Sequence, residues 1–468
     1  MKTLLRNVRI ILAFFLILSI ATLIGLVIQQ RRSETHFRAV AGENKQILRE
    51  RYRQAGKIIS ADGVILADSS SGERKYAADG AVAEALLQIV GDYTHNIVNT
   101  VESQLQGPLL GNRDNLIKQL ELDVRGLGFH GDDVLLTVLA SLSKRAYQQL
   151  GGHKGAVVLL NYETGDIIAS VSSPSTSPTN VVKWQNIPDS ALFNRALNGR
   201  FAPGSTFKVI TAAAWMRSPA FDPNLEVHCQ GDVPVVPSGA FENHSHANHG
   251  TVGLGEAFSQ SCNIFFGQVG INTGPDLLEQ EANTFGVGRP LGLPYLTATQ
   301  SRIEFPRNDR PLLSWAAIGQ PAGETVLTMS PLHLAMIAGG VANDGAMMTP
   351  HIVAALKDPL DAIYDRRSVT TQFKLPQEVV RPLDQLMSGV VTNGTGRQAA
   401  VRGHEIGGKT GTVQMTDDAG GETIYSLFIG YDKTPGYPYA IAVVVENKGY
   451  SAAQIAGNIL ANTSKIEP

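Results

Sequence analysis

A serine and a lysine follow a Pro-Gly pair in "APGSTFK", at positions Ser205 and Lys208. The Pro-Gly pair predicts a helix start, with Ser205 in the first turn, where main-chain N–H groups have no partner inside the helix. These groups, together with the positive end of the helix dipole, can stabilise an oxyanion beside the serine. Lys208 lies on the same helix face, because residues three apart are neighbours there.

The residues that follow Lys208, "VITAAAWM", are almost all apolar and predict a buried helix. Burial lowers the pKa of a lysine, so Lys208 can take a proton from Ser205. The alternative is a capping serine and a lysine that extends its charge to solvent. The same spacing occurs in "SLSK" at Ser141 and Lys144, where the mid-helix position indicates a solvated surface.

Two more short patterns combine residue types suited to this chemistry. In "SQSCN", Ser261 and Asn263 stand between two predicted helices, where both side chains can face one cleft, although helix capping is the favoured explanation when this string is taken alone. In "GGKTGTV", Lys409, Thr410, Gly411 and Thr412 lie on a predicted strand. A glycine within a strand indicates close approach of another chain, which suits an edge strand that binds an extended peptide and its C-terminal carboxylate. A turn is the alternative.

A group of histidines raises the question of a metal. The chain has two cysteines, and one of them lies near the "HSHANH" stretch: the group is His228, Cys229, His244, His246 and His249. Such a group can hold zinc, but a solvated loop is the favoured interpretation, so we predict no metal and no cofactor. We expect Cys262 to be a free thiol rather than a partner of Cys229. Glu279 and Asn283 are expected to be polar positions on a helix.

The N-terminus carries an uncharged apolar run from Ile10 to Ile28. At about 1.5 Å per residue it is long enough to cross a bilayer, and it exceeds the apolar region of a cleaved signal peptide, the rival interpretation. Lys2, Arg6 and Arg9 precede it, while Arg31 and Arg32 follow, which favours a cytoplasmic N-terminus. We therefore expect a cytoplasmic tail at 1–9, an anchor at 10–28 and an extracytoplasmic remainder.

The remainder is predicted to form two parts. Residues 33–130 mix short helices and strands, with an Asp62-Gly63 hairpin, and are typical of a small spacer domain. Residues 131–468 begin with a predicted helix in "DDVLLTVLASLSKRAYQQLGG", continue as the strand pair "GAVVLLNYETGDIIASVSS", and end in three strands and a helix. Strands at both ends of a helical middle predict an α+β domain, with an antiparallel sheet flanked by helices and a helical subdomain.

Composition excludes some classes of protein. The chain has 468 residues, 43% hydrophobic and 17% charged, with a net charge of −3. It can build a large core, and it lacks the basic excess typical of nucleic-acid binding. Two cysteines imply no disulfide framework.

Ser-x-x-Lys, Ser-x-Asn and Lys-Thr-Gly, in this order, form a signature of penicillin-recognising serine enzymes. With "FNRALNGRFAPGSTFK", "AAIGQ", "VANDGAMMTPHIV" and "TNGTGRQA" around them, the chain resembles a class B penicillin-binding protein of the compact type with a short spacer. The likeness is strong over 131–468 and weak over 33–130. "YSLFIG" and "SPLHLA" depart from the usual letters, and we expect neither departure to remove activity.

The resemblance implies roles for the residues of the three motifs. Ser205 corresponds to the acylated nucleophile and Lys208 to its general base. Ser261, assisted by Lys409, corresponds to the proton shuttle, and Asn263 to a ligand of the substrate amide. Thr410 and Thr412, which flank Gly411, correspond to the carboxylate-binding pair, and the N–H groups of Ser205 and Thr412 to the oxyanion hole.

The resemblance also implies an activity and partners. The activity is peptidoglycan D,D-transpeptidation, which cross-links stem peptides, and β-lactams would acylate the same serine. A membrane glycan polymerase is the implied protein partner. A β-lactamase or D,D-carboxypeptidase, a penicillin-sensing receptor and a catalytically silent wall-synthesis scaffold are the alternatives. The apolar anchor and the spacer argue against a β-lactamase or D,D-carboxypeptidase. The short cytoplasmic tail argues against a receptor, and the intact motifs argue against a silent scaffold.

Overall fold

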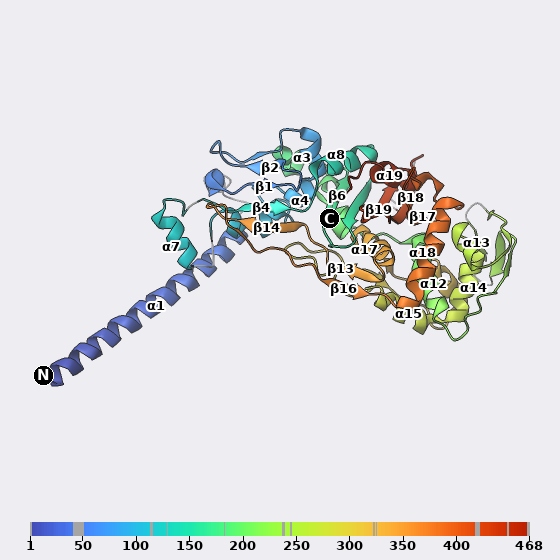
Figure 1. The fold of residues 1–468 in the computed structure, drawn as a ribbon, viewed down its shortest axis with the longest axis horizontal. Helices are drawn as coiled ribbons and strands as arrows, with labels where there is room; N and C mark the ends of the chain where they lie inside the picture. The colour runs from blue at the N-terminus through green and yellow to red at the C-terminus, as the bar shows by residue number, and fades with distance from the viewer. Residues whose placement is uncertain are drawn as a thin grey trace.

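The protein forms two joined lobes and a projecting N-terminal helix (Figure 1). The computed structural model describes residues 2–40, 51–112, 116–128, 130–181, 183–235, 239–243, 246–321, 323, 325–416, 422–446 and 449–465. In Figure 1 the chain begins at the tip of α1 (Lys2–Val40), and the lobe that contains α13 (Leu254–Ser259) and α14 (Asn263–Thr273) lies at the opposite end.

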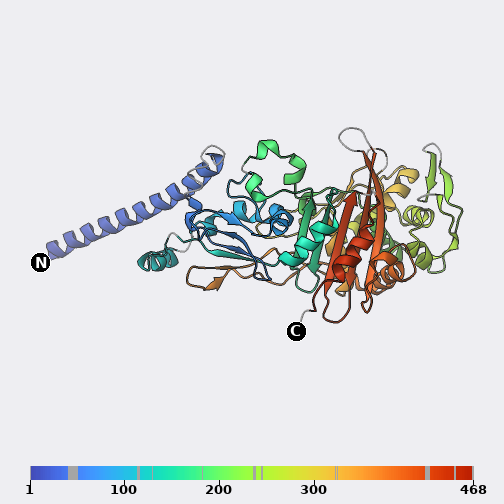
Figure 2. The ribbon, with the colours of Figure 1, turned by 90° about the horizontal axis from the view of Figure 1, so that it is seen from above.

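Helix α1 stands away from the rest of the protein (Figures 1 and 2). Within it, Arg9–Val27 is long and apolar enough to cross a membrane, the one such helix among the described residues. The side chains described along this segment contact no core, as expected for a helix whose apolar surface is covered by lipid rather than protein. The predicted anchor at 10–28 corresponds closely to this segment.

The lobe next to α1 is built on a six-stranded sheet. Its strands, in spatial order, are β15 (Ile363–Tyr364), β14 (Val353–Lys357), β4 (Asp133–Leu136), β1 (Ile58–Ile59), β2 (Ile65–Asp68) and β3 (Lys75–Tyr76). The predicted hairpin at Asp62-Gly63 is confirmed, since β1 and β2 pair antiparallel and Gly63 has a φ of 78°. Five short helices complete this lobe: α3 (Gly80–Ala85), α4 (Leu87–Val90), α5 (Val101–Gln104), α6 (Gln106–Leu109) and α7 (Leu116–Val124).

One predicted helix is wrong over its first turns. Residues Asp133–Leu136 form β4, and the helix α8 covers only Ala140–Gln149. The sequence misled because Val134, Leu135 and Leu136 are all apolar, and so short an apolar run does not distinguish the repeat of a strand from that of a helix. β14 and β15, which follow position 350, add to the same sheet, so both parts of the chain contribute to this lobe.

The second lobe contains a five-stranded antiparallel sheet. Its strands, in spatial order, are β17 (Ile406–Thr416), β18 (Glu422–Asp432), β19 (Tyr439–Glu446), β5 (Gly155–Asn161) and β6 (Ile167–Ser173). All five strands were predicted. Runs such as "VVLL" and "AIAVVV" are rich in β-branched residues and buried on both faces, as a central strand between two helical layers requires.

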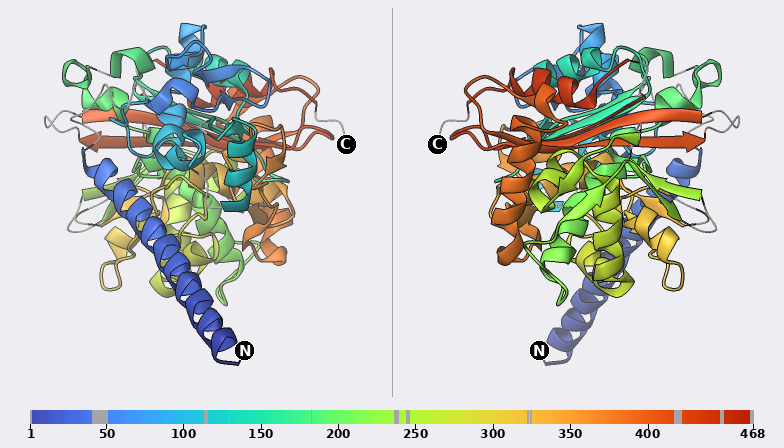
Figure 3. Two further views of the ribbon diagram at one scale, coloured as in Figure 1. Left: turned by 90° about the vertical axis from the view of Figure 1, so that its left-hand side faces the viewer. Right: turned by 90° about the vertical axis from the view of Figure 1, so that its right-hand side faces the viewer.

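Helices cover both faces of this sheet (Figure 3). On one face, α8 and α19 (Ala452–Leu460) pack against Val157 and Ile441, and on the other, α17 (Pro331–Ala342) packs against Val158 and Ala440. Alternate strand residues thus supply separate cores, because successive side chains point to opposite faces. This arrangement confirms the predicted α+β class with an antiparallel sheet flanked by helices.

The helical subdomain lies beyond the edge strand β17. Besides α13 and α14, its elements are the 3-10 turn η3 (Gly204–Phe207), α12 (Lys208–Met216), α15 (Pro275–Thr284), α16 (Arg310–Ala317) and α18 (Gln377–Thr392). The paired strands β7 (Val227–Cys229) and β10 (Gly250–Val252), with the hairpin β8 (Asp232–Val235) and β9 (Gly239–Glu242), form a ribbon against α14. The remaining short α-helices and strands are α9 (Pro178–Val181), α10 (Asp189–Leu192), α11 (Arg195–Asn198), β11 (Arg302–Ile303), β12 (Leu327–Thr328), β13 (Ala346–Met348) and β16 (Thr371–Lys374).

Candidate active site

The turn that carries Ser205 packs directly against strand β17. Gly204 has a φ of 51°, and a Cβ at this position would lie 2.6 Å from Cγ2 of Val413 and 3.0 Å from the carbonyl oxygen of Thr412. Only glycine satisfies both the left-handed backbone and this close approach. The Pro-Gly pair therefore serves to bring the serine turn against the strand. Ser205 lies in the 3-10 turn η3, one turn before α12 begins at Lys208.

Gly411 and Gln320 determine how strand β17 lies against the serine turn. A Cβ on Gly411 would lie 3.1 Å from Cγ2 of Thr206 and 3.2 Å from the carbonyl oxygen of Pro203, so the strand also needs a small residue here. The side-chain amide of Gln320 donates to the carbonyl oxygen of Thr412 at 2.8 Å. The position of Thr412 relative to Ser205 is thus set from both sides.

Ser261 occupies a strained position at the end of α13. Its φ is 60°, in the left-handed region that glycine normally fills. The Cys262 N–H donates to the carbonyl oxygen of Ala257 at 2.8 Å and the Ser261 N–H to that of Phe258 at 3.2 Å, the bond pattern of a Schellman cap. A serine in place of the usual glycine indicates that the hydroxyl is retained at a cost in backbone energy.

Lys208 is fully buried, and its ammonium group binds the second motif. Its Nζ donates to the carbonyl oxygen of Ser261 at 2.7 Å, to Oδ1 of Asn263 at 2.7 Å and to Oγ of Ser261 at 3.3 Å. Burial lowers its pKa well below the ordinary value, and the positive charge of Lys409 lowers it further, while Cys262 opposes the shift. Among the described residues, no hydrogen bond joins Lys208 to the Ser205 hydroxyl.

Lys409 reaches the same serine from strand β17. Its Nζ donates to Oγ of Ser261 at 2.9 Å and to the carbonyl oxygen of Thr410 at 3.1 Å. It is also fully buried, and burial lowers its pKa to about 7. A lysine with this pKa can exchange its proton near neutral pH, which is what a proton relay needs.

Asn263 is fixed by three separate contacts. Its Oδ1 accepts from Lys208, its Nδ2 donates to the carbonyl oxygen of Glu242 at 2.7 Å, and its main-chain N–H donates to Oδ1 of Asn243 at 2.7 Å. The last two partners belong to the β8–β9 hairpin and the residue after it. The ribbon therefore helps to orient the second motif.

The threonines of the third motif share the partly exposed face of β17. Thr410 and Thr412 alternate with the buried Lys409 and Gly411, as the two-residue repeat of a strand requires. The Thr410 hydroxyl bonds to that of Thr395, which lies after α18. The two threonine side chains thus lie on one face of the edge strand.

The structure brings the predicted residues of the three motifs together. Lys208, Ser261, Asn263 and Lys409 share one hydrogen-bond network, and the Ser205 turn packs against the strand that carries Lys409. Ser141 lies elsewhere. It is an exposed residue of α8, and Lys144 forms an ion pair with Asp79 at 2.6 Å, so "SLSK" is a helix surface, as predicted. The predicted mid-helix position is wrong, because α8 begins at Ala140 and Ser141 lies in its first turn.

The two cysteines are free thiols, as expected, but they lie close together, which the sequence did not predict. His249 joins them, whereas His228 and His246 are exposed. His244 lies outside the described residues. Burial raises the pKa of the Cys262 thiol to about 11.

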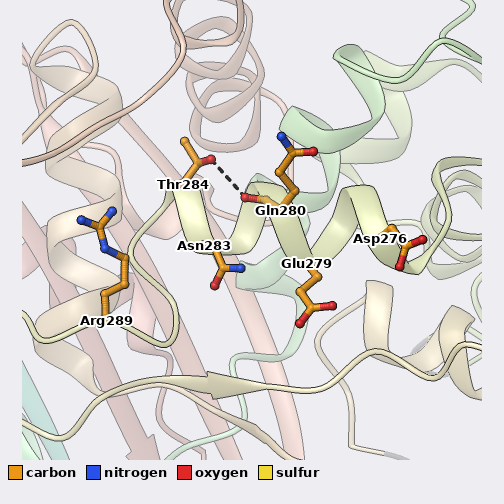
Figure 4. Close-up of a pocket in the computed structure, with 6 residues that line it drawn as sticks. All are labelled: Asp276, Glu279, Gln280, Asn283, Thr284 and Arg289. Atoms are coloured by element: carbon orange, nitrogen blue, oxygen red, sulfur yellow. Dashed lines mark hydrogen bonds between the residues drawn. The ribbon is translucent and has the colours of Figure 1, made fainter.

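Glu279 and Asn283 lie on α15, as predicted, where they line a surface pocket (Figure 4). Both point to the same side of the helix in this view. Glu279 is ion-paired with Arg307, which also pairs with Asp276. These are the bonds of a polar helix face, and neither residue belongs to the network around Ser261.

Comparison with known proteins identifies the family. A profile of the penicillin binding protein transpeptidase domain matches residues 155–465, which include all three motifs. The chain belongs to the penicillin-binding protein transpeptidase family. Among relatives of this penicillin-binding protein, the peptidoglycan D,D-transpeptidase PbpA of Mycolicibacterium smegmatis is 29% identical over 98% of this chain and 97% of its own. The protein of the same name from Mycobacterium tuberculosis is 31% identical over 89% of each chain.

Solved structures lead to the same family. Penicillin-binding protein A from M. tuberculosis, as an imipenem acyl-enzyme complex, superimposes with a TM-score of 0.76 at 29% identity and covers 88% of this chain and 99% of that one. Its ceftriaxone acyl-enzyme complex gives 0.77 over 88% and 98%, at 29% identity. The predicted resemblance to a class B penicillin-binding protein is confirmed.

Three contributors were not predicted as site residues. Gln320 fixes Thr412, Thr395 binds Thr410, and Asn243 binds the main chain of Asn263. Gln320 lies within "AAIGQ" and Thr395 within "TNGTGRQA", two of the strings on which the family resemblance is based. The resemblance of these strings is the sequence signal that could have identified both residues. Asn243 had no such signal, because only the fold places it beside α14.

Proposed function

We propose that this penicillin-binding protein performs D,D-transpeptidation through an acyl-enzyme on Ser205. The observation that carries the proposal is the convergence of two buried lysines, Lys208 and Lys409, on the Ser261 hydroxyl beside the serine turn. Two ammonium groups cannot both remain charged at low cost in one buried site, so one of them is held ready to accept a proton.

In the first step, Oγ of Ser205 attacks the carbonyl carbon between the two terminal D-alanines of a stem peptide. Lys208, in its neutral form, takes the serine proton. The N–H groups of Ser205 and Thr412 stabilise the oxyanion, where a single donor is worth about 3–4 kcal/mol. The C–N bond then breaks, and the leaving D-Ala takes a proton passed through Ser261 with the help of Lys409.

In the second step, an amine from a neighbouring stem peptide attacks the ester carbonyl. The ester bond to Ser205 breaks, the serine regains its proton, and a new amide cross-links the two stems. Asn263 binds the substrate amide. Thr410 and Thr412 bind the substrate carboxylate along the edge strand, which Gly411 allows to lie close to the serine turn. A β-lactam follows the first step, but its leaving amine stays tethered, so the acyl-enzyme persists.

This assignment requires a hydrogen bond between Nζ of Lys208, which is bonded to Ser261 and Asn263, and the Ser205 hydroxyl before acylation. Catalytic hydrogen bonds are often long or misaligned in the free enzyme and shorten in the substrate complex. The flexible lysine stem allows this bond to form, while the partners on the second motif hold the ammonium until then.

The arrangement in the cell is part of the same proposal. The tail at 1–9 is cytoplasmic, residues 10–28 of α1 form a membrane anchor, and the catalytic part is extracytoplasmic, because more positive charge precedes the span than follows it. Residues 33–130 form the spacer domain and 131–468 the transpeptidase domain, and three strands of the second part, β4, β14 and β15, extend the sheet of the spacer. A membrane glycan polymerase supplies the strands that this enzyme cross-links.

Labelling with a fluorescent penicillin tests the nucleophile. We expect a long-lived covalent adduct on the wild-type protein and on Ser141→Ala, and none on Ser205→Ala, by gel fluorescence and intact mass. Rapid loss of the label would support a β-lactamase instead, and no label on the folded wild type would support a silent scaffold. A labelled Ser205→Ala protein would overturn the site assignment.

A further inference from the structure

Cys229, His249 and Cys262 form a compact cluster next to the second motif. Their possible ligand atoms all lie within 4.8 Å of one another, and both cysteines are fully buried. We propose that these three residues bind a thiophilic divalent metal ion, with Zn²⁺ as the best-fitting one. The three side chains come from strand β7, the residue before strand β10, and the start of α14.

The spacing fits tetrahedral zinc. With Zn–S of about 2.3 Å and Zn–N of about 2.0–2.1 Å, a tetrahedral site separates a sulfur from a nitrogen ligand by about 3.6 Å and two sulfurs by about 3.8 Å. Sγ of Cys229 lies 3.6 Å from Nδ1 of His249. The Cys262 sulfur lies at most 4.8 Å from the other two ligand atoms, which is about 1 Å more than the separation in a tetrahedral site. A small rotation of the Cys262 side chain can remove this difference. Three protein ligands leave the fourth position for solvent.

A buried amide supports the sulfur ligand. Nδ2 of Asn243 donates to Sγ of Cys229 at 2.9 Å and to the carbonyl oxygen of Ala247 at 2.6 Å. An amide that donates to a sulfur stabilises the thiolate form, and metal sites commonly hold their ligands through such neighbours. Asn243 is only 3% exposed, so this bond is shielded from water.

A bound metal ion would stabilise the ribbon formed by β7 to β10 against α14. Cys229 pairs with Gly250 in the two-stranded β7–β10 ladder, and Asn263 at the start of α14 donates two hydrogen bonds to the end of the β8–β9 hairpin. A small β-ribbon has little apolar area of its own to bury, and a metal that joins it to a helix replaces part of that missing core. Zinc on Cys262 would tie the ribbon to the N-cap of α14.

The charges balance. When the ion binds, both S–H protons leave to solvent and two Zn–S bonds form, with no change of oxidation state. Two thiolates and one divalent cation sum to zero, so the occupied site adds no net charge beside the buried Lys208 ammonium. The same binding would keep two adjacent thiols from oxidising to a disulfide.

The site touches the proposed catalytic machinery without being part of it. Cys262 stands between Ser261 and Asn263 in the sequence, and Asn243 contacts both Cys229 and the main chain of Asn263. An ion bound to Cys262 would hold in place the residue that directly follows Ser261, and so would restrict the position of the Ser261 hydroxyl. The metal is therefore a structural support, and the inference stands on the cluster alone, whatever the reaction at Ser205.

The test measures metal binding by the full chain in detergent. The protein is reduced, stripped with a chelator and titrated with Zn²⁺ against a chromophoric chelator, and Co²⁺ is used as a spectroscopic probe. We expect one equivalent of Zn²⁺ with a Kd below about 1 µM, and a thiolate-to-Co²⁺ charge-transfer band. Cys229→Ser and Cys262→Ser should lose binding, Asn243→Ala should weaken it about 10- to 100-fold, and the exposed His228→Ala should bind like the wild type.

A second measurement needs no variant that could misfold. Bound Zn²⁺ should slow alkylation of both native thiols by at least tenfold relative to the stripped, reduced protein. Less than a tenth of an equivalent bound, equal alkylation rates with and without Zn²⁺, or a His228→Ala protein that loses binding would each overturn the proposal. So would a Cys229–Cys262 disulfide in the isolated protein whose reduced form still binds no Zn²⁺.

Discussion

The Nζ of Lys409 lies 2.9 Å from Oγ of Ser261, and both groups belong to elements that meet only in the folded protein. Lys409 comes from the edge strand β17, while Ser261 is the left-handed residue that ends α13. The lysine is fully buried, and its pKa is lowered to about 7. Because the pKa of Lys409 is lowered on folding, the stability of the protein depends on pH. Substitutions of Lys409 and of the residues around it test this arrangement one contact at a time.

Replacing Lys208 by arginine should lower the rate of penicillin acylation. Arginine keeps the positive charge but cannot act as a neutral base, and general-base catalysis is typically worth about 10²–10⁴-fold. Stopped-flow acylation with a fluorescent penicillin measures this directly. Lys144→Arg on the α8 surface is the matched control and should react at the wild-type rate. Near-normal acylation of Lys208→Arg would contradict the base role.

The stability contributed at Lys409 should rise with pH. Its folded pKa of about 7 lies below the ordinary value of 10.5, so between these pH values the unfolded chain binds more protons than the folded one. Raising the pH through this window therefore stabilises the fold, by up to about 1.4 kcal/mol per unit. We expect the Tm of the wild type minus that of Lys409→Met to increase from pH 7 to pH 10. A difference that stays flat over this range would show that Lys409 has an ordinary pKa.

Ser261→Gly should be more stable than Ser261→Ala. Both variants lack the hydroxyl that binds Lys409, so both should lose acylation activity. They differ in the backbone, because the φ of 60° costs alanine about 1 kcal/mol or more and costs glycine little. Denaturant unfolding of the two variants, compared with each other, checks the difference. Equal stabilities would mean that this position is not held in the left-handed region.

Gly204→Ala should damage both stability and acylation. The added Cβ meets a positive φ and would lie 2.6 Å from Val413, so the serine turn must move away from β17. We expect a loss of about 1–3 kcal/mol and a large fall in the acylation rate. Gly63→Ala is the control, since its φ is also positive but nothing lies within 4 Å of the new Cβ. It should lose only the backbone term, about 1 kcal/mol, and keep its acylation rate.

Gln320→Ala should slow acylation without a comparable loss of stability. The amide holds the carbonyl of Thr412, whose N–H is proposed to stabilise the oxyanion. A lost hydrogen bond of about 0.5–1.5 kcal/mol corresponds to a fall of about 2- to 13-fold in the acylation rate constant. Gln454→Ala, on the exposed face of α19, is the control and should leave the rate unchanged. An unchanged rate in Gln320→Ala would remove this residue from the positioning of Thr412.

Much of the fold could be predicted because strand and turn signals are local. The strand pair around Thr164-Gly165 and the three C-terminal strands follow from β-branched runs between turn residues. The start of α8 could not, since the apolar run in β4 is too short to show a period, and only pairing with β1 and β14 identifies it as a strand.

By itself, the sequence determined the chemistry that the site can contain. The order of the three motifs supplied the hydroxyls, lysines and asparagine, and the apolar helix after Lys208 predicted that this lysine is buried. Tertiary structure decided which groups meet. The two lysines on one hydroxyl and the cluster of Cys229, His249 and Cys262 depend on long-range packing. Residues far apart in the chain are brought within bonding distance only when the sheet edge and the helical subdomain are buried against each other, and no local pattern encodes that contact.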